Sequence, residues 1–330
     1  MASDLWVALQ TCNPVPGRTP AGLTRWAIIL RACVFSMTVT SGLIGVMLAW
    51  RSGFFSWPLS ILVVLGLLLA HAANNVLNDL MDFRSGVDTA DYHRVKYAPH
   101  PIHAGWLTAR AMFLVFIALS FADLVILVIL TGARGLPVAG FALAGFLISV
   151  AYVGGKFSLK FLGLGEAAVF VVWGPLMIGG TYWVMAGSIP SRILWASIPY
   201  ALLVTTVILG KHIDKLEADK SKGIKTLPVL LGAKNALALI YSLMGLFYLI
   251  LLCESVLNIL PAASLLALFS LPRAFLVWKT LRQPKPAEAP KDWPIWPLWY
   301  VGWCFHLVRL AGGLMLMGFF GQVILERFFR

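Results

Sequence analysis

The chain has 330 residues, of which 60% are hydrophobic and only 12% are charged. This composition excludes an ordinary soluble domain and predicts an all-α, polytopic membrane protein with about nine spans of roughly 20 to 25 residues. The formal charge of +12 would suggest a nucleic-acid partner in a soluble protein. In a membrane protein it is typical of cytoplasmic loops rich in Lys and Arg, so we expect no nucleic acid.

Residues 1–22 form a polar leader that lacks the basic start and apolar core of a signal peptide. We expect this leader to lie on the membrane surface and residues 23–330 to form one integral membrane domain. The four cysteines show no CxxC spacing. We interpret them as small core residues rather than disulfide partners or metal ligands: Cys12, Cys33, Cys253 and Cys304.

Nine apolar stretches follow along the chain. The predicted spans are residues 26–50, 57–79, 106–130, 137–152, 167–184, 193–210, 236–256, 261–278 and 298–325. The Pro-rich segment QPKPAEAPKDWPIWP between the last two is interpreted as a stiff connector. Lys and Arg are concentrated in the loops that follow even-numbered spans. The positive-inside rule therefore places those loops and the N-terminus on the cytoplasmic side, and the C-terminus outside.

Half of the 14 acidic residues occupy two short segments, at the ends of the second and sixth spans. The first segment holds Asp79, Asp82, Asp88 and Asp91, and the second holds Asp214, Glu217 and Asp219. Acids are costly next to hydrocarbon, so their concentration at span ends predicts a bound cation. Both segments are expected on the cytoplasmic side, on two halves of the bundle that face one another.

The first segment also carries two asparagines on the same helical face. At about 100° per residue, an i, i+3, i+4, i+7 stripe is formed by Asn75, Asn78, Asp79 and Asp82. Oxygen-only ligands suit Mg²⁺, which commonly shares its shell with phosphate oxygens. Bases lie near both segments in the sequence: Arg94, Lys96, Lys156, Lys160 and Lys225. Carboxylates, divalent ions and bases together favour a diphosphate site.

The chemistry also follows from missing motifs. The sequence contains no nucleophile elbow, HExxH helix or Walker lysine loop. An allylic diphosphate needs no nucleophilic side chain, because Mg²⁺ and bases can stabilise the departing pyrophosphate. Aromatic side chains such as Tyr152 and Trp173 could stabilise the remaining allylic cation.

Three ordered motifs resemble the UbiA superfamily of intramembrane prenyltransferases. They are NDLMDFRSGVD, YVGGKFSLKFLGLGEAAVFVVWGPLMIGGTYW and DKSKGIKTLPVLLG. The first is most similar to the 1,4-dihydroxy-2-naphthoate prenyltransferase branch, whereas KYAPHPIHAGWLT is closer to the hydroxybenzoate-type loop. The resemblance implies a nine-helix bundle around a central cavity. It also implies that Asn78, Asp82 and Asp88 hold one Mg²⁺, with Asp79 a ligand or a neighbour of the ligands.

By the same resemblance, Asp214 and Asp219 hold a second Mg²⁺. Relatives usually place these acids four residues apart, whereas here they are five apart, roughly 140° off one helical face. Either Glu217 is a ligand, or the helix breaks before Asp219. The bases named above would bind the diphosphate. Substrate contacts are expected from Asn75, Tyr152, Glu166 and Trp173, and Asp79, Glu166 or water would deprotonate the acceptor.

We therefore predict a multi-pass enzyme of the cell (inner) membrane with its active site on the cytoplasmic side. It would use Mg²⁺ to transfer a prenyl group from a polyprenyl diphosphate to a small aromatic acceptor, within the lipid bilayer. One alternative is a UbiA-type terpene cyclase, which would close the same cation on its own tail. Another is a secondary transporter, although its acids would lie nearer the bilayer midplane.

Two further polar residues lie inside apolar spans. Asp123 in the third span is either a functional group or a neutral, hydrogen-bonded one. Arg31, Arg273 and Arg309 are expected either to pair with it or to face the cavity. His71 precedes the acidic face by one helical turn and is interpreted as a packed, neutral core residue. The three histidines of the following loop are expected to make loop contacts rather than bind metal: His93, His100 and His103.

Overall fold

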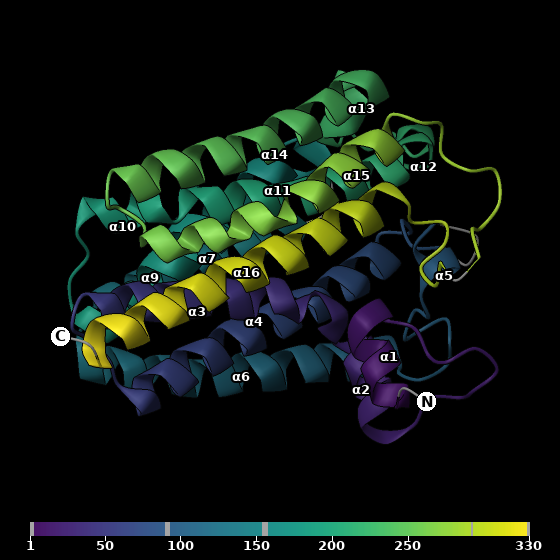
Figure 1. Ribbon diagram of the computed structural model, residues 1–330. Helices are drawn as coiled ribbons and strands as arrows, with labels where there is room; N and C mark the ends of the chain where they lie inside the picture. The colour runs from purple at the N-terminus through teal and green to yellow at the C-terminus, as the bar shows by residue number, and fades with distance from the viewer. Residues whose placement is uncertain (1–2, 90–92, 154–157, 292, 329–330) are drawn as a thin grey trace.

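A computed structural model describes residues 3–89, 93–153, 158–291 and 293–328, and their regular structure is entirely helical (Figure 1). The all-α prediction is confirmed. The helices are α1 (Asp4–Thr11), α2 (Gly22–Ile29), η1 (Ala32–Val34), α3 (Phe35–Arg51), α4 (Trp57–Arg84), α5 (His93–Tyr97), α6 (Ala109–Arg134), α7 (Pro137–Val153), η3 (Leu159–Leu162), α8 (Gly165–Val171), η4 (Val172–Gly179), α9 (Gly180–Ala186), α10 (Ser191–Ala196), α11 (Ile198–Asp214), α12 (Leu216–Ser221), α13 (Leu227–Leu231), α14 (Ala233–Val256), η5 (Ala262–Ser270), α15 (Leu271–Leu281) and α16 (Tyr300–Phe328).

The long helices lie side by side, and each predicted span has a counterpart. Within the described ranges, eight helical segments are long and apolar enough to cross a membrane, and the 17-residue α7 takes the place of the fourth predicted span. Helices α8, η4 and α9 form one such segment. Its middle part is a π-helix that contains Pro175. Proline has no backbone N–H to donate, and such wide turns are frequent at functional sites.

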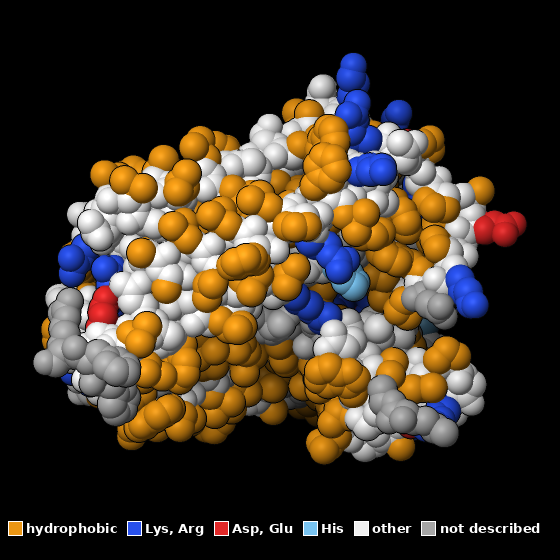
Figure 2. Space-filling model, viewed as in Figure 1, with side chains coloured by type: hydrophobic (Ala, Val, Ile, Leu, Met, Phe, Trp, Pro, Cys, Tyr) orange, Lys and Arg blue, Asp and Glu red, His pale blue; other side chains and the backbone are white. Residues whose placement is uncertain are grey.

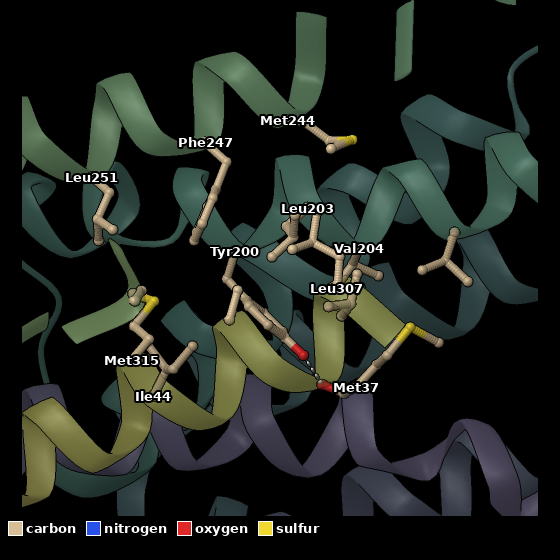
Figure 3. Close-up of a cluster of buried hydrophobic side chains, with 14 of the residues drawn as sticks. Met37, Ile44, Tyr200, Leu203, Val204, Met244, Phe247, Leu251, Leu307 and Met315 are labelled. Atoms are coloured by element: carbon tan, nitrogen blue, oxygen red, sulfur yellow. Dashed lines mark hydrogen bonds between the residues drawn. The ribbon is translucent and has the colours of Figure 1, made fainter. Parts of the chain in front are cut away.

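Helix α11 is the centre of the bundle. In the segment Ser191–Asp214, which contains α11, 78% of the most apolar stretch is buried inside the protein, whereas in α6 the share is 11%. Tyr200 and Leu203 of α11 pack against Phe247 of α14 and Leu307 of α16 (Figure 3). Hydrophobic side chains also cover much of the outer surface, as expected for a bundle that lies in lipid, whereas Lys and Arg side chains gather near α12 and α13 (Figure 2).

The first predicted span is not one continuous helix. Arg31, between α2 and η1, has a φ of 54°, in the left-handed region. This conformation ends α2 and turns the chain, and the Arg31 guanidinium reaches Asp79 on α4. The prediction of an unbroken helix over residues 26–50 is therefore wrong at Arg31.

The N-terminal leader packs on the bundle instead of lying apart from it. Ala8 of α1 is fully buried against Ala27 and Ile28 of α2. Beyond α1, the Asn13 side-chain amide donates hydrogen bonds to the carbonyl oxygens of Tyr97 (2.8 Å) and Pro294 (3.2 Å). The leader thereby covers the end of the bundle that carries α5 (Figure 1).

A disulfide also anchors the leader. Cys12 and Cys33 are bonded, so the interpretation of these two residues as separate core side chains is wrong. They lie 21 residues apart, and the pairing depends on the turn at Arg31, which the sequence pattern did not indicate. Cys253 and Cys304 are free thiols, and only Cys304 is buried.

Candidate active site

A cavity of about 890 Å³ runs between the helices. Its polar end is lined by Arg31, Asn75, Asn78, Arg94 and Lys211. The rest of its wall is mostly apolar and comes from α4, α6, α7 and η4. A charged end joined to a long apolar space fits an amphiphile with an anionic head and a hydrocarbon tail.

Oxygen atoms of the first motif converge on one cation. The Lys160 ammonium from η3 donates to Asn78 Oδ1 (3.0 Å) and to both carboxylate oxygens of Asp82 (2.6 and 2.8 Å). Asn78 Nδ2 also donates to Asp82 Oδ2 over 3.1 Å, because these residues are one turn apart on α4. The face of α4 that carries Asn78 and Asp82 therefore binds a positive charge. In this structure the charge is that of Lys160, which was predicted to bind the diphosphate.

Asp79 has a different environment from Asp82. It is fully buried between two guanidinium groups, those of Arg31 and Arg94. Arg94 Nε and Nη2 each donate to one Asp79 oxygen over 3.2 Å, a bidentate pair. Asp79 thus holds two arginines at the charged end of the cavity.

Asp88 returns to the cluster because its loop folds back on α4. Its backbone N–H donates to Asp82 O over 3.0 Å. Oxygens of Asp79 and Asp88 and a ring nitrogen of His100 lie within 4.8 Å of one another. Burial, followed by repulsion from Asp82 and Asp79, raises the pKa of Asp88 to about 6. A nearby cation would favour the charged form of this carboxyl.

Of the loop histidines whose side chains the structure describes, His100 joins these acids. Its Nε2 lies 3.7 Å from Asp88 Oδ2. His103 makes a loop contact, as predicted, with Asp88 O at 2.8 Å. No pattern in the sequence distinguishes His100 from His93 and His103 as a site residue.

The second motif reaches the first through a broken helix. Helix α11 ends at Asp214, Lys215 has φ −103° and ψ 2°, and α12 begins at Leu216. Of the two alternatives, the helix break is the one observed, and Glu217 is exposed. Asp219 is buried, and its Oδ1 lies 3.5 Å from the Lys215 ammonium, which also acts electrostatically on Asp88. Lys215 therefore links the two motifs.

Asp214 does not join this group. Its carboxylate accepts backbone N–H groups of Trp299 (2.8 Å) and Val301 (3.0 Å), where α16 begins. Lys285 Nζ lies 3.4 Å away. Carboxylates are favourable at helix N-termini because free N–H groups and the helix dipole point at them. The predicted metal-binding role of Asp214 is not supported by this geometry; Asp214 holds the start of α16.

We predict that Asp214→Ala lowers the melting temperature but keeps prenyl transfer within a few-fold of wild type, measured well below the melting transition. Loss of a capping group costs about 0.5–2 kcal/mol. Asp214→Asn should melt between Asp214→Ala and wild type, since its one amide oxygen can replace only one of the two oxygens that accept from Trp299 and Val301. Loss of activity in Asp214→Asn as large as in Asp219→Asn would return Asp214 to the metal site.

The remaining predicted residues fall into four groups. Asn75, Tyr152 and Trp173 line the cavity, and Asn75 Nδ2 donates to Leu30 O over 3.0 Å. Lys96 and Lys225 are exposed and do not line the cavity. Glu166 is buried, and its Oε1 lies 2.7 Å from His212 Nδ1. Asp91 and Lys156 lie outside the described residues.

Two further bases line the cavity, Arg31 and Lys211. For Arg31, facing the cavity was one of the two expected roles, whereas Lys211 was missed as a site residue. Lys211 lies in α11, one turn before Asp214. Its position at the end of an apolar run, next to the second acidic segment, could have identified it as a site residue. Neither Asp123 nor His71 is part of the acidic cluster, although both line the cavity. His71 is buried, as predicted, and its Nδ1 lies 2.7 Å from Thr38 Oγ1. The predicted partners of Asp123 are bound elsewhere in two cases: Arg31 pairs with Asp79, and Arg309 donates to Cys33 O.

Comparison with known proteins decides the family. The sequence profile of the UbiA prenyltransferase family matches residues 38–296. The chain belongs to the UbiA prenyltransferase family. It is therefore a prenyltransferase and an integral, multi-pass membrane protein.

Individual UbiA relatives are distant but cover most of the chain. A UbiA prenyltransferase domain-containing protein 1 homolog of Drosophila melanogaster is 25% identical over 85% of this chain and 78% of its own. The 1,4-dihydroxy-2-naphthoate octaprenyltransferase of Bacillus subtilis is 27% identical over 77% of this chain and 78% of its own. A UbiA homolog from Archaeoglobus fulgidus, solved with GPP and Mg²⁺, shares the fold with a TM-score of 0.61, at 16% identity over 89% of this chain and 98% of that one.

Proposed function

We propose that this UbiA enzyme transfers a prenyl group from a polyprenyl diphosphate to a hydroxylated aromatic acceptor, with Mg²⁺ as cofactor. The main support is the convergence of Asn78 and Asp82 oxygens on one cation at the charged end of an apolar cavity. We place this end on the cytoplasmic side, because Lys and Arg side chains gather near it.

The donor set fits magnesium. The oxygens around the Lys160 ammonium are amide and carboxylate oxygens, the ligand types that Mg²⁺ prefers. Asn78, Asp82 and Asp88 would hold one ion, and Asp219 would contribute to a second. Bound Mg²⁺ supplies neutralising charge for the pyrophosphate leaving group.

The chain's own bases would complete the head-group site. Asp79 fixes Arg31 and Arg94 at the cavity, so both guanidinium groups are oriented before substrate arrives. Lys211 on α11 lines the same end of the cavity. The two guanidinium groups favour an anionic diphosphate, and the apolar wall excludes water from the allylic carbon.

An acceptor pocket borders this site. Trp173 Nε1 and Asn74 Oδ1 are buried, line the cavity and have no hydrogen-bond partner within the described part of the chain. The Trp173 ring meets the His71 ring edge-on at 5.2 Å. Buried polar atoms are normally satisfied, so a ligand that accepts from Trp173, donates to Asn74 and offers a ring is favoured. A dihydroxy-arene has this chemistry, in keeping with the name of the Bacillus subtilis relative.

Trp173→Phe keeps one aromatic ring and removes the five-membered ring that carries the N–H. We expect the KM for the aromatic acceptor to rise about tenfold, with the KM for the prenyl diphosphate unchanged, because one buried hydrogen bond is lost. Trp195→Phe, on the exposed surface, is the matched control. An equal change in both KM values would contradict the acceptor assignment.

Product analysis tests the proposed function itself. The enzyme in lipid nanodiscs, given Mg²⁺, prenyl diphosphates and hydroxylated arenes, should release pyrophosphate and form a prenylated arene detectable by mass spectrometry. A cyclic hydrocarbon formed without acceptor would favour the terpene cyclase instead. Pyrophosphate-free flux of a solute in vesicles would favour a transporter.

A further inference from the structure

The apolar part of the cavity contains one carboxylate, that of Asp123 on α6. This residue is near the middle of the helix that spans Ala109–Arg134. Its side chain lines the cavity, and its Oδ1 lies 3.2 Å from the place where a Cβ on Gly66 of α4 would be. The carboxylate therefore lies between α4 and α6, at a depth where the bilayer is hydrocarbon.

No neutralising partner accompanies this acid within the part of the chain that the structure describes. Among the residues that the structure describes, none forms a hydrogen bond or ion pair with Asp123. The bases that line the cavity, Arg31, Arg94 and Lys211, belong to its charged end. An acid at membrane depth is costly, so its presence on a cavity wall indicates a function rather than packing.

The depth of Asp123 can be expressed in prenyl units. Gly66, its neighbour on α4, is twelve residues before Asn78, which corresponds to about 18 Å along the helix. An extended isoprene unit has four chain bonds and spans about 5 Å. A chain whose diphosphate is held near Asn78 would thus meet Asp123 after about three to four units.

We propose that Asp123 sets the preferred length of the prenyl donor. The inference rests on the proposed function, since it assumes that the cavity holds the donor's tail. A tail of up to three units ends before the carboxylate, and the end of a fourth unit only reaches it, so the carboxylate stays hydrated. A longer tail must pass it and displace its water, or bend away, so binding weakens. Gly66 contributes by leaving room for the carboxylate, because a Cβ there would crowd Oδ1.

The test compares donors of two, three, four and eight isoprene units with the full-length enzyme in nanodiscs. Wild type should prefer three or four units over eight, and Asp123→Leu should reduce that preference about tenfold by removing the polar group. Asp123→Asn stays polar and should keep most of the preference. Val128→Leu, on the exposed face of α6, should leave the profile unchanged.

The outcomes separate this inference from the function on which it rests. Transfer with the same length profile in Asp123→Leu and wild type would overturn the inference alone. Equal use of four and eight units by wild type would also overturn it. Absence of transfer with every donor in wild type would overturn the proposed function, and the inference with it.

Discussion

Asp82→Ala should lower prenyl transfer by about 10²- to 10³-fold without unfolding the protein. Asp82 supplies two of the three oxygens that converge on the Lys160 ammonium, and removing one such electrostatic contact at a reacting charge has an effect of this size. The measurement is pyrophosphate release at saturating donor and Mg²⁺, together with a melting curve.

Glu217→Ala is the matched control for Asp82→Ala. Glu217 is an exposed acid of the second motif, and its removal should leave the rate unchanged. If Asp82→Ala kept more than a tenth of wild-type activity, the first motif would not be the metal site. If Glu217→Ala were as inactive as Asp82→Ala, the geometry of the second motif would be misassigned.

Asp79→Ala should lower stability as well as activity. The substitution leaves Arg31 and Arg94 without their shared carboxylate, and breaking a buried ion pair from one side typically costs about 3–5 kcal/mol. We expect a clear fall in melting temperature and a loss of diphosphate binding, because both arginines lose their orientation.

The comparison with Asp82→Ala separates positioning from metal binding. Asp79→Ala should melt lower than Asp82→Ala, although the two residues are only three apart on α4. An Asp79→Ala protein with wild-type melting and weakened Mg²⁺ binding would show instead that Asp79 is a metal ligand. Diphosphate binding followed by calorimetry, with and without Mg²⁺, distinguishes these results.

Local periodicity explains which parts of the site were predictable. The Asn78–Asp82 pair lies one turn apart on a single helix, so its shared face follows from the sequence alone. The apolar runs likewise predicted the spans, because a run of that length is typical of a helix that crosses the hydrocarbon core of a membrane.

The main failures at the site involve contacts between distant segments. Asp214 accepts from the backbone N–H of Trp299, 85 residues later at the start of α16, and Arg31 pairs with Asp79 across 48 residues. The five-residue spacing of the second motif indicated that Asp214 and Asp219 could not share one face of a continuous helix. Only the break at Lys215 shows that Asp219 turns towards the site and Asp214 away from it. Such pairings depend on how helices pack, which no single stretch of sequence encodes.

The most direct test of the shared metal–diphosphate site is a structure of the enzyme with Mn²⁺ and a non-reactive prenyl thiodiphosphate, with manganese located by anomalous scattering. We expect manganese on the oxygens of Asn78 and Asp82, with the diphosphate between this ion and the side chains of Arg94 and Lys211. A diphosphate bound away from these residues, or manganese bound elsewhere, would contradict the site.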